Sequence, residues 1–196
     1  MVGGMAGVSQ AALVDQSSLW QYTTLTQDLW PTWSSVSHST FDWGSAVWNT
    51  GLAAFGNDKY GTPGYLSHNT FWAEGTDLAL QKTFSINGTL TSNVAMNIAS
   101  DNGFVVFING LQVAKANAEG YTSLWEYPYT VDASYFHSGE NIVQAFAEDH
   151  GYATYFDLQM NGDVNPVSAV PEPATMMLLG SGLLGMIGLG RKKFLR

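Results

Sequence analysis

Alternation of apolar and polar residues is the feature that most limits what this chain can fold into. Between residues 90 and 100, Val94, Met96 and Ile98 occupy every second position. Successive side chains of a β-strand point to opposite faces, so this spacing predicts a strand with one buried face. A helix would need apolar residues three and four positions apart instead.

The same period returns near the end of the chain's main body. Residues 154–160, TYFDLQM, predict another strand whose apolar side chains face the core. The two polar residues between them, Asp157 and Gln159, would then face solvent.

Residues 103–110, GFVVFING, are apolar at consecutive rather than alternate positions. Such a run predicts a strand that is covered on both faces. It ends in Asn109-Gly110, a strong signal for a tight hairpin, so residues 111–116 should form the partner strand.

Further strands are predicted at residues 78–86, 121–131 and 140–149, with Gly, Asn and Asp clusters between them. Many short strands joined by turns are typical of an all-β sandwich or jelly roll, here a single domain over residues 12–165. Residues 29–65 are rich in Trp, Ser and Gly and show no clear period, so mostly loop and short strands are expected there.

From residue 48 to residue 160 the order of these pieces resembles the galactose-binding-like jelly roll of bacterial secreted enzymes and surface proteins. The resemblance rests on WNTGLAAFG, LALQKTFSI, SDNGFVVFINGLQVAKAN, SGENIVQAFAEDHG and YFDLQM. Its most specific part is the Asp-x-Gly, apolar strand and Asn-Gly hairpin between Asp101 and Val113. The resemblance implies a fold that hosts sugars, other ligands or no ligand.

Composition excludes several classes of protein. The chain has no cysteine, which rules out thiolate metal sites, thiol catalysis and disulfides. Fifteen of its sixteen acidic residues but only three lysines precede residue 171, which gives this body a charge of about −12. Such a body repels nucleic acid and suits Ca²⁺, so a structural Ca²⁺ is the one cofactor to consider.

The C-terminal segment differs from this body. Residues 174–190 contain no charge and would reach roughly 25 Å as a helix at ~1.5 Å per residue. Four of the seven basic residues follow within the last six positions. We therefore expect a transmembrane helix over 174–190 and a cytoplasmic basic tail over 191–196, with the acidic body on the other side of the membrane.

This segment also resembles the PEP-CTERM sorting signal of exported Gram-negative proteins. The resemblance rests on three parts in order, a Pro-Glu-Pro motif in a linker over 166–173, an apolar helix and a basic cluster. The motif residues are Pro171, Glu172, Pro173, Arg191, Lys192 and Lys193. The resemblance implies an exosortase that cuts near Pro-Glu-Pro, so the membrane would hold only the precursor and the mature protein would reach the cell surface or the medium.

Residues 1–11 are small and apolar, and Ser9-Gln10-Ala11 before Ala12 is similar to a signal-peptidase site. They include no basic residue, which a complete signal peptide would have, so these residues are expected to be part of a signal peptide whose true start lies upstream. A frayed N-terminus is the alternative.

The four histidines are scattered without metalloprotease spacing, and no G-x-S-x-G motif occurs. Glu148 and Asp149 are adjacent, and neighbours on a strand point to opposite faces, so they should not act on one glycosidic bond. The sequence therefore predicts a protein that is not an enzyme and has no catalytic residues.

Two groups of residues are candidates for ligand binding. Trp125, Tyr127 and Tyr129 fall at every second position and would share one face of a strand, either as an exposed platform for sugars or as rings that fill the sandwich. The other group lies in predicted loops, where it would form a ligand or Ca²⁺ rim or simple polar turns. It comprises Asp101, Asn102, Asp149 and His150.

These features predict an exported, non-catalytic module that binds carbohydrate, in particular exopolysaccharide. A purely structural matrix or adhesion component is the first alternative, and a secreted glycan-active enzyme is the second.

Overall fold

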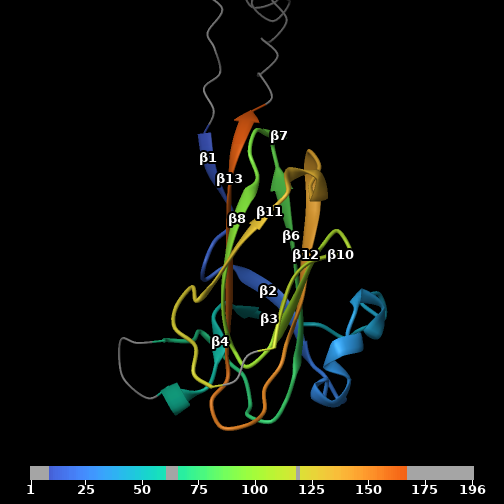
Figure 1. Ribbon diagram of the computed structural model, residues 1–196, viewed down its shortest axis with the longest axis vertical. Helices are drawn as coiled ribbons and strands as arrows, with labels where there is room; N and C mark the ends of the chain where they lie inside the picture. Colours follow the sequence, from blue (N-terminus) through green and yellow to red (C-terminus); the bar gives the residue numbers. More distant parts are fainter. Residues whose placement is uncertain (1–8, 61–65, 118–119, 167–196) are drawn as a thin grey trace, which may run out of the picture. The chain divides into compact units, whose positions relative to one another are not determined.

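The computed structural model describes residues 9–60, 66–117 and 120–166, which form a β-sandwich of two sheets (Figure 1). All pairings between neighbouring strands are antiparallel except that of β4 with β5. The all-β, jelly-roll-like fold predicted from the sequence is confirmed. The predicted helix over 174–190, the Pro-Glu-Pro motif and the basic tail lie outside the described residues, among which no helix is long and apolar enough to cross a membrane.

The strands are named in chain order. Sheet A contains β11 (Tyr127–Val131), β8 (Val94–Asp101), β13 (Tyr155–Pro166), β4 (Phe55–Gly56) and β5 (Thr70–Phe71), with β1 (Ser9–Val14) and β7 (Gly88–Leu90) also paired to β13. Sheet B contains β10 (Leu111–Ala116), β9 (Phe104–Ile108), β12 (Gly139–Ala147), β6 (Leu78–Ile86), β2 (Leu19–Thr24) and β3 (Asn49–Leu52). Short 3-10 helices are η1 (Trp30–Ser35), η2 (His38–Thr40), η3 (Asp58–Tyr60) and η4 (Ala133–Tyr135).

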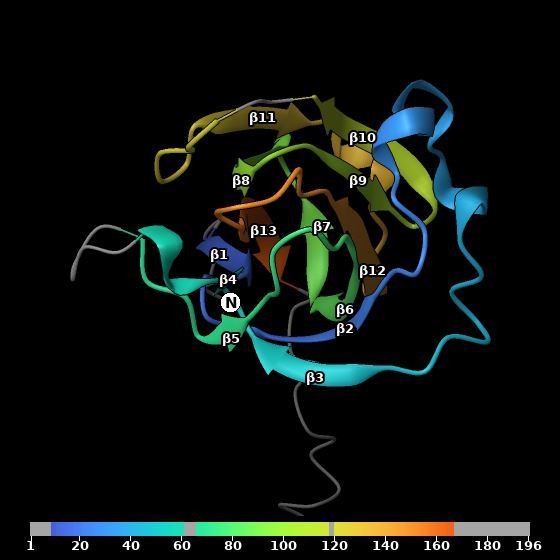
Figure 2. The ribbon, with the colours of Figure 1, turned by 90° about the horizontal axis from the view of Figure 1, so that it is seen from below.

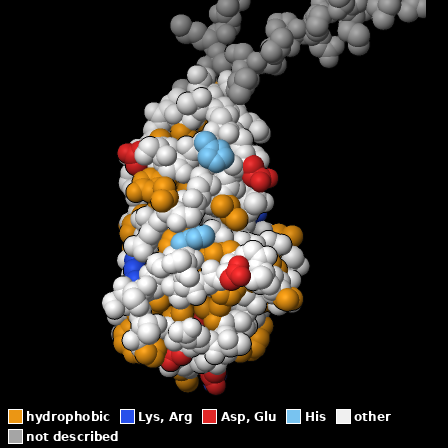
Figure 3. All heavy atoms as spheres, turned by 90° about the vertical axis from the view of Figure 1, so that its right-hand side faces the viewer, with side chains coloured by type: hydrophobic (Ala, Val, Ile, Leu, Met, Phe, Trp, Pro, Cys, Tyr) orange, Lys and Arg blue, Asp and Glu red, His pale blue; other side chains and the backbone are white. Residues whose placement is uncertain are grey.

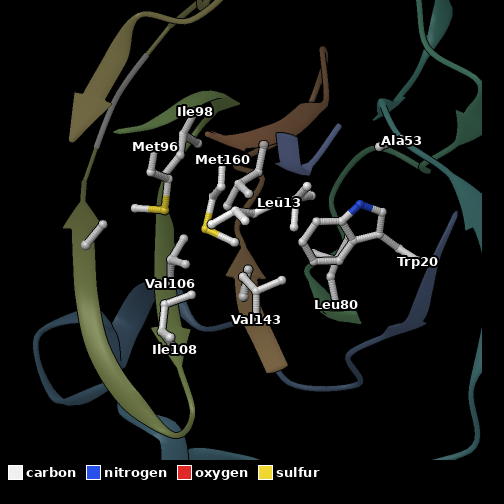
Figure 4. Packing of buried hydrophobic residues seen from close by; sticks show 14 of the residues in the cluster. Leu13, Trp20, Ala53, Leu80, Met96, Ile98, Val106, Ile108, Val143 and Met160 are labelled. Carbon is white, nitrogen blue, oxygen red and sulfur yellow. The ribbon is translucent and has the colours of Figure 1, made fainter. Parts of the chain in front are cut away.

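The main hydrophobic core fills the space between the two sheets (Figure 4). Sheet A contributes Met96, Ile98 and Met160, and sheet B contributes Val106 and Val143, all fully buried. The alternate apolar residues of β8 and β13 thus share one face, as their period predicts.

The predicted hairpin joins β9 to β10. Ile108 pairs with Leu111, which leaves Asn109 and Gly110 as the two turn residues. Their φ angles are 51° and 82°, the left-handed values that a two-residue hairpin turn requires and that Asn and Gly tolerate best.

Strand β9 is covered on both faces, as its consecutive apolar residues predict. Val106 and its inward neighbours face the core, while Val105 and Phe107 face outward and are also buried. They lie under residues 29–48, named here the covering segment, which crosses the outside of sheet B in Figure 2. This segment contains η1 and η2 and otherwise loop. Figure 3 looks onto this side of the molecule, where hydrophobic side chains remain visible among polar ones.

Two details of the predicted strands are wrong. Asp157 does alternate with the inward residues of β13, but it is buried instead of facing solvent. Loop residues cover it on the outside of sheet A, where Ala54 and Leu66 pack with Ala99 and Tyr155. The strand predicted over 121–131 begins only at Tyr127, because Trp125 lies in a turn with φ of 59°.

The N-terminal strand β1 includes the residues of the expected signal-peptidase site. Ser9, Gln10 and Ala11 pair with β13 at Val164, Asp163 and Gly162. Cleavage before Ala12 would remove half of β1 and retain its buried end, Leu13 and Val14. Cleavage at this position stays a prediction.

Candidate functional site

A pocket of about 500 Å³ opens at one end of the sandwich. Three segments that are distant in sequence form it: residues 25–30 after β2, residues 75–77 before β6, and residues 149–150 after β12. Its size lies within the range of pockets that hold small molecules. Its lining residues are Leu25, Thr26, Gln27, Asp28, Trp30, Gly75, Thr76, Asp77, Asp149 and His150.

Asp77 holds these three segments together. Its Oδ2 accepts a hydrogen bond of 2.7 Å from the Leu29 amide, and its Oδ1 accepts one of 3.1 Å from the Asp149 amide. The backbone carbonyl of Asp77 also accepts from the Leu25 amide. Because a buried carboxylate is costly without such donors, the position of Asp77 fixes both neighbouring loops relative to β6.

Trp30 forms an aromatic wall at the mouth of the pocket. Its backbone amide donates to Asp28 Oδ1 at 2.9 Å, which fixes the turn that starts η1. Trp30 is 41% exposed, and its indole meets the His150 ring edge to face, with the ring centroids 4.1 Å apart. One large aromatic surface is therefore held in place and remains open to solvent.

Two buried residues, Glu148 and Asn102, hold His150 in place. Its Nε2 lies 2.9 Å from Oε1 of the fully buried Glu148, and its amide donates to Asn102 Oδ1. Glu148 Oε2 has no hydrogen-bond partner and lies against Gly103, where any Cβ would come within 2.5 Å of it. Glycine at residue 103 leaves the space that this carboxylate occupies.

Burial raises the pKa values of three carboxyl groups at this end of the sandwich. For Asp77 the hydrogen bonds from Leu29 and Asp149 act against this rise, and for Glu148 the hydrogen bond from His150 does so. For Asp149, backbone amides act against burial, among them that of Gly75, which donates to Oδ2. Desolvation is the largest cause in all three cases.

The carboxylates do not form a metal site in the part of the chain that the structure describes, where no group of three or more His, Asp or Glu residues is arranged to hold an ion. Asp77 illustrates the reason, since both of its carboxylate oxygens already accept backbone amides. The geometry gives the structural Ca²⁺ that the sequence left open no set of ligands among these residues.

The sequence-predicted loop residues separate into two groups. Asp149 and His150 line the pocket. Asp101 and Asn102 are buried beside it, where Asn102 supports the His150 loop instead of facing the pocket. Glu148 and Asp149, which are adjacent in sequence, lie in different places. Asp149 lines the pocket, whereas the Glu148 side chain is directed towards Gly103 and does not line it.

The aromatic platform predicted from Trp125, Tyr127 and Tyr129 is wrong in its geometry. Tyr127 pairs with Ile98 and Tyr129 with Met96, and directly paired residues share a face of the sheet. Both tyrosine rings therefore pack inward on Phe104, with centroid distances of 5.1 and 6.1 Å. Any ligand contact of the half-buried Trp125 stays a prediction.

Sequence reasoning missed Asp28, Trp30 and Asp77. Asp28 precedes Trp30 by two residues and Pro31 follows Trp30. An aspartate shortly before a proline is a local signal for a turn whose backbone amide the carboxylate accepts, so the sequence could have indicated this residue. Asp77 had no such signal, because its role depends on loops distant in sequence.

Residues 169–193 match the model of the PEP-CTERM protein-sorting motif. The chain carries this sorting motif. The motif implies an exported protein that an exosortase processes during export, with a precursor anchored in the membrane before processing. No curated protein matches the chain.

Two solved structures share the fold of the body. Ruminococcus gnavus β-glucuronidase matches with a TM-score of 0.50 and 10% identity, over 80% of this chain and 29% of that one. The R. gnavus β-glucuronidase in complex with D-glucaro 1,5-lactone matches with a TM-score of 0.50 and 9% identity, again over 80% and 29%. The chain spans less than a third of either enzyme, and at this identity the likeness concerns the fold alone.

Proposed function

We propose that this protein is a non-catalytic carbohydrate-binding module of the cell surface or extracellular matrix, and that it binds exopolysaccharide through the pocket beside Trp30. The observation that carries the proposal is the exposed indole fixed at the mouth of a carboxylate-lined pocket. Sugars present apolar C–H faces that stack on aromatic rings and hydroxyl groups that donate to carboxylates.

The pocket offers both kinds of contact at once. Trp30 supplies the ring, and the exposed carboxylate of Asp28, which also lines the pocket, supplies an acceptor for a hydroxyl hydrogen. The sorting motif places such a protein among exported proteins, where polysaccharide is available.

Both solved neighbours are glycosidases by name, which raises catalysis as an alternative. A paired-carboxylate mechanism needs two carboxyl groups on either side of one bond. Here Glu148 is fully buried and does not line the pocket, so the adjacent Glu148 and Asp149 do not supply that pair. This geometry argues against hydrolysis by that adjacent pair.

The test is polysaccharide retention of purified residues 9–166 in affinity electrophoresis, after a glycan array has identified a ligand. Trp30→Ala should weaken retention about five- to tenfold, because one lost ring contact removes on the order of 1 kcal/mol of apolar burial. Its melting temperature should change little, and Trp30→Phe should restore part of the retention.

Leu111→Ala is the matched control, because Leu111 is 60% exposed on β10 and does not line the pocket. It should bind as the wild type does. Equal retention of Trp30→Ala and wild type would contradict the proposed site, and a glycan array without any bound sugar would instead favour a purely structural matrix component.

Surface delivery is tested separately in the full chain. Changing Pro171 and Pro173 to Ala should block processing, so that the protein accumulates in the inner membrane with its C-terminus attached. Cell fractionation and the mass of the exported product measure this. An intact Arg196 on wild-type protein outside the cell would contradict the predicted cleavage.

A further inference from the structure

A cavity of about 110 Å³ lies on the outside of sheet A, between β13 and the loops that cover it. Since one water needs roughly 10–15 Å³ of such space, the cavity has room for an ion together with water. Among the described residues that line it, six of nine side chains carry an oxygen atom and none carries a basic group. The six are Gln16, Ser17, Ser67, Asn69, Tyr155 and Asp157.

Asp157 lies on the buried side of this cavity and is 4% exposed. The one hydrogen bond that the described residues give to its carboxylate comes from the neighbouring Leu158 amide, which donates to Oδ1 at 2.8 Å. Asp77, by contrast, is held by amides from two distant loops. A buried carboxylate without a base or several donors is costly, and burial raises the pKa of Asp157 to about 7. Either a proton or a cation would remove this cost.

We infer that this cavity binds a monovalent metal cation, sodium or potassium, with Asp157 as its charged ligand and the neutral oxygens of the rim around it. One carboxylate neutralises one positive charge, whereas Ca²⁺ sites collect several charged ligands. The amide nitrogen of Asn69 donates to the Ala53 carbonyl, so its oxygen is left to act as an acceptor. The site is separate from the pocket beside Trp30 and does not depend on the proposed function.

Such an ion would join segments that are distant in sequence. Residues 16–17 follow β1, residues 66–69 precede β5, and Asp157 belongs to β13. These segments meet only in the folded chain, so a bound cation would stabilise the folded state and leave the unfolded state unaffected.

Thermal unfolding of residues 9–166 at about pH 8, where Asp157 is mostly ionised, measures this stabilisation. Sodium or potassium chloride is compared with tetramethylammonium chloride at equal ionic strength. The methyl groups of tetramethylammonium keep its charge away from oxygen ligands, while it screens surface charges as the metal ions do. A metal ion present at about ten times its Kd should raise the melting temperature by about 3–6 °C above the value in tetramethylammonium.

Three variants locate the effect. Asp157→Asn should lose the difference between the salts, because an amide brings no charge to the cavity. Ser67→Ala, at an exposed rim position, should reduce the difference through loss of one neutral ligand. Asp163→Asn removes the same charge from β13 outside the cavity lining and should keep the full difference.

An NMR titration of the Asp157 carboxyl carbon gives a second readout that a purely structural role would not move. A bound cation favours the ionised form, so the pKa of Asp157 should be lower in potassium or sodium than in tetramethylammonium.

Equal melting temperatures and equal pKa values of Asp157 in all salts would overturn the cation site and leave a carboxyl compensated by a proton alone. An equal rise in Asp157→Asn and wild type would also overturn it. Stabilisation by Ca²⁺ but by neither sodium nor potassium would overturn the monovalent assignment. None of these results bears on sugar binding beside Trp30, which the retention assay tests.

Discussion

The two outer faces of the sandwich are covered in different ways. On sheet B the outward residues Val105, Phe107 and Phe146 are apolar, and the covering segment packs on them with Leu29 and Trp33. On sheet A the outward residues of β13 include Asp157 and Gln159, yet loops cover part of this face as well. On sheet B, apolar residues of the strands pack against apolar residues of the covering segment. On sheet A, the covering loops bury the carboxylate of Asp157.

The difference shows that the face a side chain occupies and its exposure are separate properties. Period two correctly assigns Asp157 to the outside of sheet A. Residues 16–17, 66–69 and Leu124 then close over it and leave a cavity of about 110 Å³. An apolar side chain on the outer face of a sheet predicts that another segment packs over it, because it would otherwise be exposed to solvent. A polar side chain at such a position gives no indication that a loop covers it.

The largest expected effect comes from breaking the cover of sheet B. Trp33 is 6% exposed at the centre of the covering segment, so Trp33→Ala should lower the free energy of unfolding by about 3–5 kcal/mol. Urea denaturation measures this. Val47→Ala in the same segment, at a residue 84% exposed, should stay within about 0.5 kcal/mol of wild type. Similar small effects for both would show that the segment does not stabilise sheet B.

Asp157→Asn tests the cover of sheet A. Burial raises the pKa of Asp157 to about 7, from 3.8 in an accessible carboxyl. Between these values the folded state keeps a proton that the unfolded state has lost, so the wild-type free energy of unfolding falls as pH rises from about 4 to 7. Asn has no charge to bury, so Asp157→Asn should be more stable above pH 7, by up to about 4 kcal/mol.

This difference should vanish below about pH 3, where the wild-type carboxyl is protonated in both states. Urea denaturation at several pH values measures it, with Asp163→Asn on the same strand as the control for loss of one charge. An equal stability of Asp157→Asn and wild type at pH 8 would mean that the loops leave Asp157 accessible.

A smaller effect is expected on the inner face of sheet A. Tyr127 is half-buried against Phe104, so Tyr127→Ala should cost about 2 kcal/mol of unfolding free energy. Tyr127→Phe should recover most of this loss, and Thr130→Ala on the exposed side of β11 should have little effect. Polysaccharide retention should not change beyond the effect of stability. A selective loss of retention would restore the predicted aromatic platform.

The sequence alone was sufficient for the features that depend on neighbouring residues. The strand faces of β8 and β13, the double cover of β9 and the Asn109-Gly110 turn follow from local period and backbone preference. The sorting motif is likewise a contiguous pattern, readable without a fold.

Tertiary structure decided which outward side chains are buried and where the pocket lies. Asp77 bonds to Leu29 across 48 positions and to Asp149 across 72, and the pocket exists only where these segments meet. The same holds for the direction of Tyr127, which its pairing with Ile98 sets, and for the loops over Asp157. The physical reason is that periodicity reports the orientation of a residue within its own strand, whereas burial and binding depend on which distant segments pack against it.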